Sequence, residues 1–85
     1  MGLTRETLLA FLVRETGLEA ADLEGEALLF SSGLVDSFTL VALLQFLEDE
    51  SGVRVPSRDI SLPNLDTVER ILAYVDRARS EGTET

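Results

Sequence analysis

One apolar stretch constrains the fold of this chain more than any other feature. Eight of the ten residues from Phe38 to Leu47 are apolar, in a chain of 85 residues. Four of them recur at helical spacing and can fill a core: Leu40, Leu43, Leu44 and Leu47. Another four lie largely off that face: Phe38, Val41, Ala42 and Phe46. A helix that is apolar on every side needs burial on every side, and a domain this small buries only a modest share of its surface.

Two outcomes are open for the surplus apolar surface of this helix. Part of it can stay exposed, and exposed apolar patches tend to be docking sites. Alternatively, the preceding loop can cover it through Phe30, Leu34 and Val35. Both outcomes can hold for different residues.

Helices are also predicted before and after this stretch. The first runs from a cap at Thr4 to about Thr16, and Gly17 ends it. The apolar helix itself runs from about Ser37 to Ser51 and ends at Gly52. The last begins at Asp66, where Glu69 three residues later resembles a capping box with Asp in place of Ser or Thr. Its apolar stripe has helical spacing: Val68, Ile71, Leu72 and Val75.

The connecting segments are less regular. Residues 18–36 have no sustained period and read as a loop with room for one short helical turn, docked on the core by the apolar cluster at 28–30. Ser57 is expected to cap a single turn through Ile60, before Pro63. Residues 81–85 read as a disordered tail.

The predicted fold class is therefore all-α. We expect a small four-helix bundle of three main helices and one short one, with a long loop between the first and second helices, in a single domain of residues 1–80. The predicted core consists of Leu8, Phe11, Leu12, Leu40, Leu44, Leu47, Val68, Ile71 and Val75.

Composition excludes most kinds of catalysis. Cysteine and histidine are absent and all seven basic residues are arginine. Disulfides, thiolate or imidazole metal sites and lysine Schiff bases are therefore excluded. Isolated carboxylates such as Asp22 and Glu24 have no recognisable catalytic spacing. We expect neither an enzyme nor a metal site.

The formal charge of −9 limits the partners. It repels nucleic acid and anionic lipid, and it attracts basic proteins. Three acids, Glu48, Asp49 and Glu50, lie in the last turn of the apolar helix, at the negative end of its dipole. This concentration of negative charge also favours a basic partner. No apolar segment reaches membrane-spanning length and no secretory signal is visible, so a monomer in the cytoplasm, not inserted in a membrane, is expected.

The pair Asp36-Ser37 stands at the start of the apolar helix. Such a pair is ordinary capping chemistry, but a helix N-terminus is also a natural place for a phosphate. The surrounding sequence, "GLVDSFTLVALLQFLEDESGVRVP", is more specific than the pair alone. In it, Asp-Ser is followed by an apolar helix, an acidic last turn, a glycine that ends the helix and a loop that contains proline. Over residues 4–79 the chain resembles the acyl carrier protein family, including carriers of polyketide and nonribosomal peptide synthases and D-alanyl carriers.

The resemblance implies a carrier without catalytic activity of its own. Ser37 would receive 4′-phosphopantetheine from coenzyme A through a phosphopantetheinyl transferase, and Asp36 would help that enzyme recognise its substrate. The arm would hold an acyl or aminoacyl group as a thioester, loaded by a ligase and passed to a downstream transferase or synthase. Partner-binding residues would lie on the same helix: Phe38, Thr39, Val41, Ala42, Gln45 and Glu48.

The sequence departs from the fatty-acid branch of that family at three positions. Phe38 replaces the usual leucine after the serine, and Thr39 and Ala42 stand where acids are common. The motif "GLVDSF" is more similar to those of stand-alone carriers of amino acids, D-alanine or specialised acyl units. The alternative is an unmodified acidic helical module in which Ser37 is only a cap.

Overall fold

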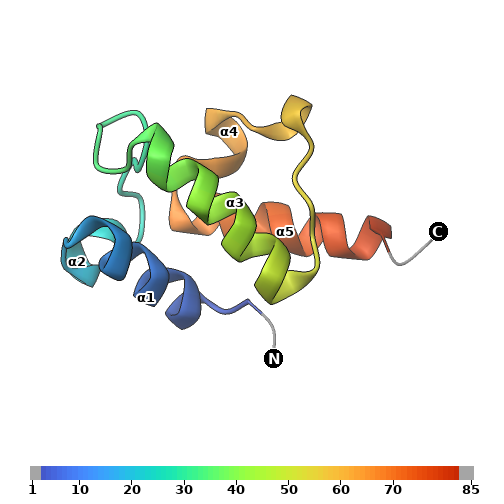
Figure 1. Cartoon of the computed structure of the whole chain (residues 1–85), viewed down its shortest axis with the longest axis horizontal. Helices are drawn as coiled ribbons and strands as arrows, with labels where there is room; N and C mark the ends of the chain where they lie inside the picture. Colours follow the sequence, from blue (N-terminus) through green and yellow to red (C-terminus); the bar gives the residue numbers. More distant parts are fainter. Residues whose placement is uncertain (1–2, 83–85) are drawn as a thin grey trace.

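A computed structural model describes residues 3–82, where all regular structure is helical, as predicted (Figure 1). The three long helices are α1 (Arg5–Thr16), α3 (Ser37–Ser51) and α5 (Val68–Gly82). Single turns connect them: α2 (Ala20–Leu23), the 3₁₀ turn η1 (Ser57–Asp59) and α4 (Leu62–Leu65). Across the described part of the chain, no helix combines the length and the hydropathy that crossing a bilayer requires.

Local capping sets the limits of α1 and α3, which agree with the prediction. Thr4 and Thr7 form a reciprocal capping box at the start of α1. Gly17 and Gly52 end α1 and α3 in the left-handed conformation, with φ of 76° and 78°. Glycine adopts this conformation without the steric cost that other residues meet.

The predicted starts of the later helices were wrong. Thr67, not Asp66, caps α5, since its Oγ1 accepts the Arg70 backbone N–H at 3.0 Å. Ser57 is the first residue of η1 and makes no cap, because Pro56 holds the N-cap position. The sequence prediction also missed α4, whose Pro63 lies in the first turn, where its missing N–H breaks no helical bond.

The C-terminal prediction differs as well. Helix α5 continues through Gly82, so the first two residues of the expected tail, 81 and 82, are helical. The remaining three, 83–85, lie outside the described residues.

The core lies between α1, α3 and α5. Figure 1 shows α3 crossing in front of α5, with α1 beside them. Phe11 of α1 stacks on Phe46 of α3 with ring centroids 4.4 Å apart. The buried hydrophobic residues are Leu8, Leu9, Phe11, Leu12, Leu23, Leu29, Val35, Leu43, Leu47, Val53, Leu65, Val68, Ile71, Tyr74 and Val75.

The predicted core was partly wrong on α3. Leu43 and Leu47 are fully buried, whereas Leu40 and Leu44 are only half-buried. The two half-buried leucines each line a surface hollow at the edge of the helix. Only two long helices cover α3, so the margins of its leucine face reach the surface.

Both predicted outcomes hold for the surplus apolar surface of α3. The loop buries Val35 and half-buries Phe30 and Leu34 against the core. Phe38 and Val41 nevertheless remain 86% and 67% exposed. In the apolar cluster at 28–30, Leu29 is fully buried and Leu28 is exposed, so only part of that cluster docks as expected.

Tyr74 fastens η1 to α5. Its hydroxyl donates to Asp59 Oδ2 at 2.8 Å, and Asn64 Nδ2 donates to the Asp59 carbonyl oxygen at 2.9 Å. Burial, followed by the hydrogen bond and the negative charge of Asp59, raises the pKa of Tyr74 to about 12. The Tyr74–Asp59 hydrogen bond thus joins η1, which has no buried residue, to the core.

We predict that Leu43→Ala lowers the free energy of unfolding by about 2–5 kcal/mol, because it leaves a cavity in a fully buried site. Leu44→Ala is the matched control and should cost clearly less, since Leu44 is half-buried. Denaturant unfolding followed by circular dichroism measures both. Equal losses would contradict this placement of the α3 core.

A pH titration tests the Tyr74–Asp59 contact. Tyr74 is the only tyrosine and tryptophan is absent, so tyrosinate absorbance reports this group alone. The unfolded tyrosine ionises near pH 10, whereas the folded pKa is about 12. The group's stabilisation is therefore complete below about pH 10 and is lost as the pH rises toward 12.

Asp59→Asn should lower the absorbance midpoint toward the ordinary value. Asp76→Asn, which removes an exposed acid from the same helix as Tyr74, should leave the midpoint unchanged. A wild-type midpoint near 10 would refute the buried hydrogen bond.

Candidate functional site

Ser37 is the first residue of α3, and Asp36 is its N-cap. The Asp36 carboxylate accepts the Thr39 backbone N–H at 2.9 Å. This hydrogen bond is the main reason that the pKa of Asp36 lies below its ordinary value. The Ser37 side chain is exposed and makes no hydrogen bond within residues 3–82. Capping therefore does not occupy the hydroxyl of Ser37.

This position fits a phosphate ester. The first turn of a helix leaves N–H groups without intrahelical partners, and the positive end of the helix dipole favours an anion. Helix α3 has 15 residues, long enough for a full dipole at Ser37. The ionised Asp36 places a negative charge beside it, which a basic partner can recognise.

A compact turn leads from the core to Ser37. The Val35 N–H donates to the Leu29 carbonyl oxygen at 2.8 Å, and the Gly33 N–H donates to that of Phe30 at 3.2 Å. We call residues 29–35 the 29–35 turn. Asp36 and Ser37 follow it directly, so the placement of this turn sets where α3 begins.

Asp66 anchors the 29–35 turn, a role that the sequence prediction missed. Its Oδ1 accepts the backbone N–H groups of Phe30 and Ser31 at 2.8 and 3.0 Å, and its Oδ2 accepts the Ser31 hydroxyl at 2.5 Å. Its carbonyl oxygen accepts the Leu29 N–H at 2.7 Å. The sequence contained one signal for this role. Asp66 and Thr67 can both cap the same helix, and because only one of them can do so, the other is free for a different contact.

The Asp66 carboxylate is buried yet stays ionised. Asp66 is only 2% exposed. Burial raises the pKa of this carboxyl, but hydrogen bonds from Ser31 and Phe30, with the positive charge of Arg70, outweigh burial and hold the pKa below its ordinary value. A buried carboxylate without these partners would be strongly unfavourable, so the anion and the turn stabilise each other.

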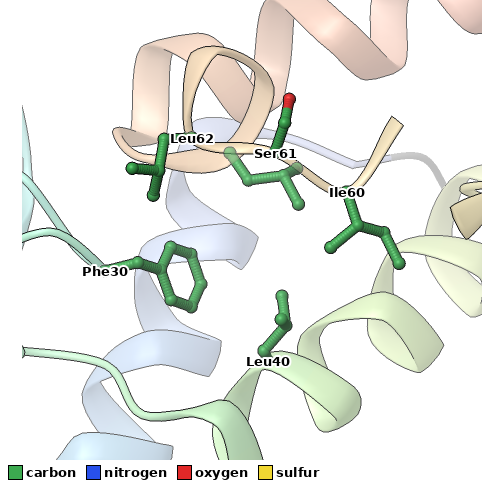
Figure 2. A pocket seen from close by; sticks show the side chains of 6 residues that line it. Phe30, Leu40, Ile60, Ser61 and Leu62 are labelled. Carbon is green, nitrogen blue, oxygen red and sulfur yellow. The ribbon is translucent and has the colours of Figure 1, made fainter. Parts of the chain in front are cut away.

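An apolar cavity of about 210 Å³ opens at the side of α3, next to Leu40 (Figure 2). Leu40 lines it from α3, three residues after Ser37, and so lies on the same side of the helix. Figure 2 shows the Phe30 ring and the Ile60 side chain approaching from opposite sides. We call this space the Phe30 cavity; its lining is Phe30, Leu40, Ile60, Ser61, Leu62 and Leu65.

The sequence could not indicate the Phe30 cavity. Its lining comes from the 29–35 turn, from α3 and from the segment around α4, which are far apart along the chain. Polar contacts hold the walls on two sides: Asp66 anchors Phe30, and the Tyr74–Asp59 contact anchors the segment that precedes Ile60.

The predicted partner-binding residues divide into two groups. An exposed line runs along α3, which we call the outer line: Phe38, Val41, Gln45 and Glu48. Thr39 and Ala42, by contrast, are half-buried beside it, and Ala42 packs against the core. A groove of about 250 Å³ between the outer line and Val55 is bordered by Glu48 and Arg54.

Comparisons with known proteins agree with this geometry. Residues 6–75 match the family model described as phosphopantetheine attachment site. The chain is 33% identical to an acyl carrier protein of Rhodococcus erythropolis, over 99% of this chain and 94% of that protein. It is 28% identical to an acyl carrier protein of Micrococcus luteus, over 91% and 98% of the two chains.

A further relative is the meromycolate extension acyl carrier protein of Mycolicibacterium smegmatis, which is 28% identical over 99% of this chain and 87% of that protein. The match decides against the unmodified interaction module. Acyl carrier proteins carry acyl groups on covalently attached 4′-phosphopantetheine, act with a modifying transferase and with biosynthetic enzymes, and are not catalysts themselves. The fold, the helix start at Asp36-Ser37 and a family match over residues 6–75 together show that this chain belongs to the acyl carrier protein family.

Proposed function

We propose that Ser37 carries the 4′-phosphopantetheine arm. The supporting observation is that Asp36 performs the capping of α3, which leaves the Ser37 hydroxyl exposed at the positive end of a 15-residue helix. The hydroxyls of Ser31, Ser32 and Ser51 instead donate to oxygen atoms of the protein. Ser57 begins a helical turn of only three residues, and Ser61 is the N-cap of one of only four.

The attachment joins Ser37 Oγ to the phosphorus of the arm. The phosphoanhydride bond of coenzyme A breaks, and its nucleotide half leaves with the bonding electrons. The hydroxyl proton passes to a base of the transferase. When bound, the arm supplies the thiol that holds the cargo as a thioester. This chain presents the hydroxyl and, through Asp36, a recognition charge.

We expect Ser37→Ala to abolish labelling by coenzyme A, Mg²⁺ and a promiscuous transferase, as read by intact mass. Asp36→Asn keeps an oxygen that can accept the Thr39 N–H, so it should fold normally and be labelled more slowly. Ser57→Ala, which changes an exposed serine of η1, is the control and should be labelled at the wild-type rate. Equal labelling of Ser37→Ala and wild type would overturn the assignment.

We further propose an acyl rather than an aminoacyl cargo. The Phe30 cavity contains one polar residue, Ser61, and no charged one, so it suits a hydrocarbon chain and not an ammonium group. Apolar cavities of about 150 Å³ hold a benzene-sized ligand, so this cavity of about 210 Å³ suits a short chain. The relatives support this, because one is named an acyl carrier protein and another a meromycolate extension acyl carrier protein.

We propose that partner enzymes contact this protein through the outer line of α3. Phe38 and Val41 are exposed within the first two turns from Ser37. Glu48 adds a charge at the far end of the line, and the net charge of −9 steers a basic partner toward it. The close contact is therefore apolar near Ser37 and electrostatic farther along α3, with Thr39 and Ala42 supporting it from the flank.

Val41→Glu should raise the KM of the transferase for this protein about tenfold or more, because it places a charge where an apolar side chain is buried on docking. The kcat should change little, since Val41 does not touch the hydroxyl. Ala73→Glu is the matched control, because it adds the same charge at an exposed position on α5. The same KM for both variants would exclude Val41 from the interface.

A further inference from the structure

The walls of the Phe30 cavity differ in how they are held. Leu40 and Leu65 stand on helices, so the hydrogen-bonded helical backbone holds both in place, and Leu65 is only 1% exposed. Phe30 stands on the 29–35 turn outside any helix, and its side chain is half-buried. The shape of the Phe30 cavity on this side therefore depends on the contacts that hold the 29–35 turn.

Asp66 alone provides that attachment by hydrogen bonds. Within residues 3–82, every hydrogen bond that joins the 29–35 turn to α4, α5 or their junction ends on Asp66. Three of these bonds reach its carboxylate, and the fourth reaches its carbonyl oxygen. Because Asp66 is 2% exposed, water is poorly placed to replace those partners.

We propose that Asp66 is a positioning residue that limits the length of acyl cargo: it holds Phe30 as a fixed wall of the Phe30 cavity. The inference rests on the proposed arm at Ser37 and on the cavity as the cargo site. A chain longer than the cavity gains further burial only by displacing Phe30, which requires the turn to leave the Asp66 carboxylate; otherwise its end stays in solvent and adds no stability. Short cargo fills the space without that cost, whereas a turn released from Asp66 admits longer chains.

The test loads wild type, Asp66→Asn, Asp66→Ala and Ser31→Ala from synthetic acyl-coenzyme A bearing butanoyl, hexanoyl, octanoyl, decanoyl or dodecanoyl groups. Intact mass confirms each product, and its Tm is compared with that of the unacylated arm-bearing form. In wild type the gain in Tm should peak at a short chain and fall for the longest. In Asp66→Ala the decanoyl and dodecanoyl gains should equal or exceed that peak, with smaller shifts in Asp66→Asn and Ser31→Ala.

Val75→Ala is the control for lost stability. Val75 is buried in α5 and does not line the Phe30 cavity, so this variant should lower every Tm and keep the wild-type dependence on length. A second readout needs no arm: amide hydrogen exchange at Phe30 and Ser31 should speed up at least tenfold in Asp66→Asn. If Asp66→Ala does not fold, Ser31→Ala and Asp66→Asn decide the question.

The outcomes separate this inference from the proposed function. Wild-type gains that do not vary with chain length would overturn the cargo site and the role of Asp66 together, while labelling at Ser37 would still stand. A length-dependent wild type with an unchanged profile in Asp66→Asn, Asp66→Ala and Ser31→Ala would overturn the role of Asp66 alone. Unchanged exchange at Phe30 and Ser31 would also refute the anchoring.

Discussion

Helix α3 carries apolar side chains around its whole circumference, and only α1 and α5 are long enough to cover it. Leu43 and Leu47 are fully buried, whereas Leu40 and Leu44 border surface hollows and Phe38 and Val41 face solvent. The functional surfaces follow from this incomplete cover. The cavity lies beside Leu40 and the groove beside Leu44, one turn farther along the same side of α3. The outer line runs between the helix start and its acidic end.

The chain compensates for this shortage of helices with polar anchors on its loops. Asp66 holds the 29–35 turn, and Tyr74 holds η1 through Asp59. Both anchors are buried, where a hydrogen bond is worth more than at the surface and an unpaired group costs more. The proposed attachment at Ser37 and the proposed cargo site both require a reproducible geometry, and these two anchors would supply it.

Sequence reasoning predicted the helix limits well where the signal was local. Thr4, Gly17 and Gly52 act on their own neighbours, so α1 and α3 begin and end where the pattern indicated. The same reasoning was wrong for Asp66 because two adjacent residues could cap α5. A contact with Phe30, 36 positions earlier, decided between them. Local pattern carries no information about a partner at that separation.

By itself, the sequence determined the all-α class and the start of α3 at Asp36-Ser37, since capping and periodicity are properties of short segments. The carrier role came from its resemblance to the acyl carrier protein family. Only the tertiary structure decided which leucines of α3 are buried, which apolar residues stay exposed and where a cavity opens. Those outcomes depend on which distant segments meet around α3. The Phe30 cavity exists because the 29–35 turn, α3 and the segment around α4 converge there, and the buried Asp66 carboxylate makes that meeting specific.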